Sequence, residues 1–195
     1  ISALSLIIYF VWDSSIYIPS TSEIRYGIPT IGITTDMMRK YAINSNDSYL
    51  GDMKRKTNKK TEFYRLWLQV NYLKITKGYK KIAVVGTSLF ENTDYVVNML
   101  NSIVKEQREN EIFNIDRCNI RKEDAYFSSD EYEIIAPGSV NNDPTIAQTA
   151  AKCDAVIVLI ISGDHNGKLV ERALDLLRLQ EANVVGVILY DVNSY

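Results

Sequence analysis

Residues 81–100 place the strongest constraint on how this chain folds. The apolar run Ile82–Val85 is followed by a short polar turn and then by the pattern of an amphipathic helix. A parallel α/β sheet usually binds phosphate at such a junction of strand, loop and helix. The loop after Gly86, however, contains Glu91 and lacks the further glycines and the lysine of a phosphate loop. The sequence therefore predicts the layout of a nucleotide site without its usual residues.

Apolar runs and amphipathic patterns alternate from residue 81 to residue 190. An amphipathic helix precedes them, beginning at Thr61 and ending at Gly78. Its apolar face consists of Phe63, Leu66, Trp67, Val70 and Leu73. Further strands are expected at Ile112–Ile115, Tyr132–Ala136, Ala155–Ile161 and Val184–Leu189, and helices at 92–108, Thr145–Lys152 and Gly167–Glu181. This order predicts an α/β fold with a mostly parallel sheet and helices on both of its faces.

The N-terminal 60 residues differ in character from this domain, which spans 61–195. Residues 1–12 are almost continuously apolar, which fits either a buried strand or helix, or the end of a transmembrane helix. The rest of segment 1–35 predicts a short helix that Gly27 stops and a strand at Ile28–Thr34. Residues 36–60 carry seven Lys and Arg against three Asp without periodicity, which indicates a basic linker.

Composition excludes several kinds of site. A net charge of −2 gives no reason to expect nucleic acid as a partner. Cys118 and Cys153 lack metal-ligand spacing and are interpreted as buried, reduced thiols in or near sheet elements. The single His165 excludes a histidine-rich metal cluster.

Three segments carry a resemblance to a known family. The first is the apolar end, followed by Asp13-Ser-Ser-Ile16 and then by YGIPTIGI from Tyr26. The second is Glu62-Phe-Tyr-Arg65, and the third is the run from Cys153 onward. Together they resemble the bacterial polysaccharide co-polymerases, or chain-length determinants, whose cytoplasmic tyrosine-kinase (BY-kinase) domain belongs to the MinD-like P-loop class. The first segment looks like the exit from that family's second transmembrane helix. The second is similar to the E-x-x-R start of a helix that mediates subunit contacts, although Leu68 replaces a further arginine. The third resembles the domain's last strand, helix and strand. The resemblance implies a three-layer, P-loop NTPase-like fold.

The nucleotide motifs of that family are not matched. The alignment places Asn92 at the Walker A lysine and Thr93 at the magnesium-binding hydroxyl, and Glu91 aims a carboxylate at the phosphate position. Thr93 is also explained as a helix N-cap. Asp116 aligns with the first carboxylate of the second Walker motif, and Ala136 with the Walker B aspartate. The alternative is that IIAPGSVNNDP matches a segment before Walker B, which also leaves no aspartate. The nucleotide-binding remnant would comprise Gly86, Asn92, Thr93, Asp116 and Ala136.

Two further features have simpler interpretations. Ser162–Leu169 contains Gly-Lys before a helix and could hold an anion, but a plain turn capped by Asp164 or Asn166 explains it. Tyr190 and Tyr195 lie near the end, where the kinases autophosphorylate a tyrosine cluster; packing tyrosines are the simpler interpretation.

Three functions follow as hypotheses. The first is a non-catalytic regulatory or interaction domain, a pseudokinase without a cofactor. It would lie on the cytoplasmic face of the cell membrane, attached through an N-terminal helix, and control capsular or exopolysaccharide chain length or export. Its partner would be a cognate tyrosine kinase or another copy, bound through Glu62 and Arg65. The second is an active ATP- and Mg²⁺-dependent kinase or NTPase, anchored by Thr93, Asp116 and Lys168. The third is an anion or small-molecule sensor.

Overall fold

The computed structural model describes residues 19–34, 49–88, 91–118, 133–161 and 167–190, with only the backbone described over 19–21, 49–60 and 108–118 and at Tyr190. Their helices are α2 (Pro19–Tyr26), α4 (Tyr49–Lys77), α5 (Thr93–Cys118), α6 (Thr145–Ala151) and α7 (Gly167–Leu179). Their strands are β1 (Thr30–Thr34), β2 (Lys81–Gly86), β3 (Glu133–Ser139), β4 (Ala155–Ile161) and β5 (Val184–Tyr190).

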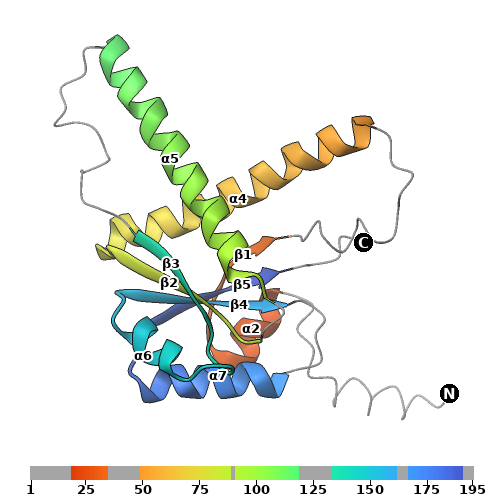
Figure 1. The fold of residues 1–195 in the computed structure, drawn as a ribbon, viewed down its shortest axis with the longest axis vertical. Coiled ribbons are helices and arrows are strands. Elements are labelled where there is room, and N and C mark those ends of the chain that lie inside the picture. The colour runs from red at the N-terminus through yellow and green to blue at the C-terminus, as the bar shows by residue number, and fades with distance from the viewer. Residues whose placement is uncertain (1–18, 35–48, 89–90, 119–132, 162–166, 191–195) are drawn as a thin grey trace.

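The five strands form one sheet in the order β1-β5-β4-β2-β3, and every neighbouring pair is parallel. Helices α4 and α5 cover one face, and α6 and α7 cover the other (Figure 1). All seven residues of the central strand β4 are buried, as expected for a parallel strand covered on both faces. The predicted three-layer α/β fold is therefore confirmed.

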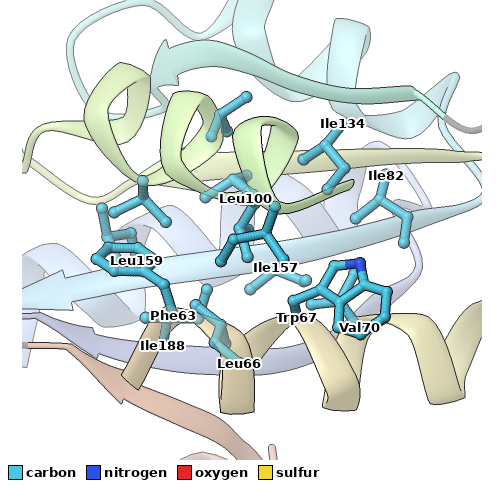
Figure 2. Close-up of a cluster of buried hydrophobic side chains, with 14 of the residues drawn as sticks. Phe63, Leu66, Trp67, Val70, Ile82, Leu100, Ile134, Ile157, Leu159 and Ile188 are labelled. Atoms are coloured by element: carbon cyan, nitrogen blue, oxygen red, sulfur yellow. The ribbon is translucent and has the colours of Figure 1, made fainter. Parts of the chain in front are cut away.

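The core between α4, α5 and the sheet contains the apolar face predicted for the first long helix. Phe63, Leu66 and Val70 are almost completely buried. They lie against α5 and the sheet strands (Figure 2). The ring of Phe63 meets that of Tyr95 edge-on, with centroids 5.8 Å apart. Removal of this apolar surface from water, at about 25 cal/mol per Å², fixes α4 on the sheet.

Two glycines end helices where the sequence places them. Gly27 and Gly78 have φ of 68° and 71°, a left-handed conformation that only glycine adopts without strain. The N–H of Gly78 donates to the carbonyl of Lys74 at 2.7 Å. Both helices therefore stop at the predicted glycine.

Helix α4 begins at Tyr49, twelve residues before the predicted start at Thr61. The prediction of a linker is therefore wrong for residues 49–60, and residues 35–48 lie outside the described part. Figure 1 shows this half of α4 standing out from the sheet, where it has no core to face. Apolar periodicity is absent for that reason, whereas its lysines and arginine favour continuation of a helix that is already nucleated.

Helix α5 continues to Cys118, so the predicted strand Ile112–Ile115 is wrong and Cys118 does not lie in the sheet. A four-residue apolar run does not distinguish a strand from a helix, and the helix-forming residues around it favour the helix. The predicted turn at Pro137 is also wrong, since β3 extends to Ser139. A shift in register against β2, between Ala83 and Val85, accommodates this proline in an edge strand.

Of the remaining sequence predictions, the one for Cys153 can be compared with the structure, and several others concern residues outside its described part. Cys153 is buried and free, as predicted. Residues 1–12, His165, Asp164, Asn166 and Tyr195 lie outside the described residues. Within the described ranges, no helix is long and apolar enough to cross a membrane.

Candidate functional site

The candidate site lies at the carboxyl edge of the sheet, in the loop between β2 and α5. Parallel α/β sheets bind ligands at this edge. Gly86 ends β2 and lies between Leu159 of β4 and Ser139 of β3. Thr87 and Ser88 follow as buried polar residues.

Glu91 folds back into this loop. Its Oε1 accepts a hydrogen bond from the hydroxyl of Thr87 at 2.5 Å, and its Oε2 accepts one from the backbone N–H of Ser88. The residue is only 8% exposed. A Cβ atom added to Gly86 would lie 2.9 Å from Oε2, so any other residue at this position would force the Glu91 carboxylate to shift. The loop therefore directs its donors at its own carboxylate.

Burial raises the pKa of Glu91 above its ordinary value of 4.5, and the hydrogen bonds from Thr87 and Ser88 oppose this shift only in part. Loss of hydration disfavours the charged form of any carboxylate. When it is ionised, Glu91 places a negative charge where a phosphate loop presents N–H donors to an incoming anion.

Asn92 and Thr93 have roles other than those of the Walker residues they align with. The Oδ1 of Asn92 accepts the backbone N–H of Tyr95 at 2.9 Å, which makes Asn92 the N-cap of α5. The prediction that Thr93 is the cap is therefore wrong. Thr93 is the first helical residue and is buried, and its methyl carbon would lie 3.4 Å from a Cβ on Gly86.

Of the other sequence-predicted residues, Asp116 lies far from this loop. Asp116 follows Thr93 by 23 residues on the same helix, which corresponds to roughly 35 Å of separation along the axis. Ala136 lies within β3 and packs against the core beneath α4 and α5. Lys168 is an exposed residue in the first turn of α7. Thr93, Asp116 and Lys168 therefore cannot form one catalytic site in this structure.

Two residues after Pro137 belong to the site and were not predicted. The Nδ2 of Asn141 donates to the carbonyls of Thr87 and Leu169, each at 2.7 Å, and so joins the loop to α7. Its Oδ1 and the Oγ of Ser139 are buried without a hydrogen-bond partner among the described residues. The sequence signal was the polar turn that follows a predicted strand, which is too common to single out a site.

Among the described residues, this edge lacks the lysine and the metal-binding carboxylate that a P-loop uses for ATP with Mg²⁺. A P-loop needs a lysine at the phosphates and a carboxylate for the metal. Asn92 caps a helix, and the carboxylate of Glu91 is already engaged within the loop. Over the described ranges, no three His, Cys, Asp or Glu side chains gather as a metal site.

A second candidate surface lies on the outer side of α4. Tyr64, Leu68, Tyr72 and Ile75 are 38%, 45%, 63% and 58% exposed. Their spacing of three and four residues places them along one side of the helix, and we call them the α4 stripe. The exposed Arg65 lies beside the stripe, and the half-buried Glu62 lies one turn earlier.

No family model and no curated protein matches the sequence. Among solved structures, the chain is similar to a BceF tyrosine kinase domain, with 12% identity, a TM-score of 0.59, and coverage of 91% of this chain and 99% of that one. It is also similar to the chimerical protein CapA2B2, with 11% identity, a TM-score of 0.58, and coverage of 89% and 99%. At these identities the likeness shows the fold alone. The chain therefore has a BY-kinase-like, P-loop NTPase-like α/β fold.

Proposed function

We propose that this chain is a non-catalytic interaction domain with a BY-kinase-like fold, in a membrane protein that controls capsular or exopolysaccharide chain length or export. Its place would be the cytoplasmic face of the cell membrane. The observation that carries the non-catalytic part is the buried carboxylate of Glu91, hydrogen-bonded to Thr87 and Ser88 where a phosphate loop presents free donors.

The expected repulsion between the Glu91 carboxylate and a bound phosphate is large enough to support the proposal. Phosphoryl transfer depends almost entirely on positioning and on neutralising phosphate charge. Two like unit charges about 4 Å apart repel by about 4 kcal/mol at an effective dielectric near 20, which weakens binding roughly a thousand-fold. The residue aligned with the Walker A lysine is Asn92, which carries no positive charge to offset this repulsion.

The α4 stripe supports an interaction role. Leu68 stands where the resembled helix has a further arginine, and it is almost half exposed. Apolar side chains that remain in water on one side of a helix are typical of a surface that binds another protein. The partner would be a second copy of this chain or a cognate tyrosine kinase.

The sensor hypothesis has weaker support. The unpartnered atoms at the site, Asn141 Oδ1 and Ser139 Oγ, include an amide acceptor. Together with the Glu91 carboxylate, which accepts a hydrogen bond from Thr87 in the same loop, they favour a hydrogen-bond donor over an anion.

Calorimetry with ATP and with ADP, each with Mg²⁺, tests the proposal. We expect no heat of binding at millimolar nucleotide. A tyrosine kinase domain with an intact phosphate loop serves as the positive control. Micromolar binding to this chain, or phosphate transfer from labelled ATP to tyrosine, would overturn the hypothesis of a non-catalytic domain and favour the kinase hypothesis.

A further inference from the structure

The N-terminal part of α4, residues 49–60, extends beyond the part of the helix that packs. Among the α4 residues whose side chains the structure describes, Phe63 is the first buried one. Figure 1 shows the preceding turns projecting from the α/β body. Twelve helical residues have a length of about 18 Å. We call residues 49–60 the basic arm.

The charge of the basic arm opposes that of the rest of the chain. The arm contains five basic residues and one acidic residue, Asp52, and so has a net charge of +4. Because the whole chain has −2, the remainder has −6. Two pairs of basic residues, Arg55 with Lys59 and Lys56 with Lys60, are four positions apart and so share one side of the helix.

We propose that the basic arm binds the anionic headgroups of a lipid bilayer and orients the domain on it. This inference rests on the membrane location in the proposed function. A projecting arm can reach a flat surface while the acidic body stays away from it. Four of the five basic residues are lysines, compact point charges that suit a diffuse negative surface rather than bidentate recognition of single phosphates.

A nucleic acid fits these observations less well. Such a ligand usually contacts a basic face of the folded domain itself. Here, the part of the chain outside the arm has a net charge of −6 and would repel the phosphate backbone.

Each lysine or arginine near an anionic bilayer strengthens binding about fivefold. The four paired residues together should therefore raise the affinity for the bilayer on the order of several-hundred-fold. The attraction is screened by salt, with a Debye length of about 8 Å at physiological ionic strength. Binding through the arm is therefore expected to weaken as salt is added.

Vesicle co-sedimentation of the full chain tests the inference. One set of vesicles contains phosphatidylcholine alone, and the other also contains phosphatidylglycerol. The arm variant replaces Arg55, Lys56, Lys59 and Lys60 with Gln, which removes four charges and retains helix propensity. The matched control makes the same four-charge change at exposed positions outside the basic arm: Lys77, Lys105, Lys152 and Arg172 to Gln.

We expect the wild type and the control to prefer phosphatidylglycerol vesicles more than a hundred-fold at low salt, and the arm variant to lose this preference. Circular dichroism of the variant checks that its helix content is retained. Equal binding to both vesicle types, or a preference retained in the arm variant, would overturn the inference. So would binding of duplex DNA as tight as that of the vesicles. Absence of any binding to phosphatidylcholine would instead count against membrane attachment through residues 1–12, so the two failures are distinguishable.

Discussion

The hydroxyl of Thr87 donates a 2.5 Å hydrogen bond to the carboxylate of Glu91, four residues further along the loop. The backbone N–H of Ser88 donates to the second oxygen of the same carboxylate. An intact phosphate loop keeps such donors for a ligand. Here the carboxylate of Glu91 accepts both hydrogen bonds, which links the stability of the loop to the protonation of one glutamate.

Glu91→Gln is expected to flatten the dependence of stability on pH. Burial raises the folded-state pKa of Glu91 above 4.5, so the folded state binds this proton more tightly than the unfolded state does. The stabilisation from this group is complete below pH 4.5 and is lost as pH rises through the folded-state pKa. Urea unfolding of both proteins from pH 4 to pH 8 measures this effect. Parallel curves for wild type and variant would show that Glu91 is not linked to folding.

Asn92→Lys restores the Walker lysine and is still expected not to restore nucleotide binding, because Glu91 remains beside it. The substitution also removes the N-cap of α5, which costs about 1 kcal/mol of unfolding free energy. Asn92→Asp is the matched control, since it retains a capping oxygen and should leave stability nearly unchanged. Calorimetry with ATP and Mg²⁺ and urea unfolding provide the two measurements. Micromolar binding by Asn92→Lys would refute this account of the loop.

Gly86→Ala is expected to destabilise the fold by about 1–3 kcal/mol. The added methyl group would lie 2.9 Å from Oε2 of Glu91 and 3.3 Å from the carbonyl of Ser88. The cost should be smaller in a Glu91→Ala background, where the first of these contacts is absent. A double-mutant cycle by urea unfolding measures the coupling. Simple additivity would mean that the backbone carbonyl, and not Glu91, excludes the methyl group.

The sequence predicts the sheet well because its central strands are long apolar runs between clear turns. The strand Ala155–Ile161 has the predicted bounds. The prediction fails in two places: residues 49–60 of α4 lack apolar periodicity, and the short apolar run near the end of α5 resembles a strand. Periodicity reports burial, so a projecting helix gives no periodic signal.

The site was predictable only in its chemistry. The alignment indicated a carboxylate near the phosphate position, and the structure shows that the carboxylate of Glu91 is buried in the loop after β2 and accepts a hydrogen bond from Thr87. Only coordinates show that Asn141 joins the loop to α7, because that contact links residues 54 apart in the chain. For Asp116 the sequence prediction was wrong. A strand was predicted at Ile112–Ile115, which would have placed Asp116 at the edge of the sheet, whereas the residue lies in α5.

Asp154 gives a pH dependence opposite in sign to that of Glu91. Its Oδ2 accepts the backbone N–H groups of Lys81 and Lys80, each at 2.7 Å, and these bonds lower its pKa below 3.8. The stabilisation is therefore present above pH 3.8 and is lost as pH falls through the folded-state pKa. Asp154→Ala should cost roughly 1 kcal/mol at pH 7 and less in acid.

The control for Asp154 is Asp175→Ala, which removes only an exposed ion pair with Arg178. Such pairs contribute little, so its unfolding free energy should match that of the wild type. Equal losses for the two variants at pH 7 would mean that the bonds to Lys80 and Lys81 do not stabilise the start of β2.

Leu68→Glu is expected to weaken association through the α4 stripe by tenfold or more, because burying a leucine side chain contributes about 1.5–3 kcal/mol. Leu68 is 45% exposed, so the substitution should leave the fold intact. Leu179→Glu, at a 75% exposed leucine on α7, is the matched control. Sedimentation velocity over a range of concentrations measures self-association. Equal behaviour of the two variants would exclude the stripe as the contact, whereas a wild type that is monomeric throughout would exclude a second copy as the partner.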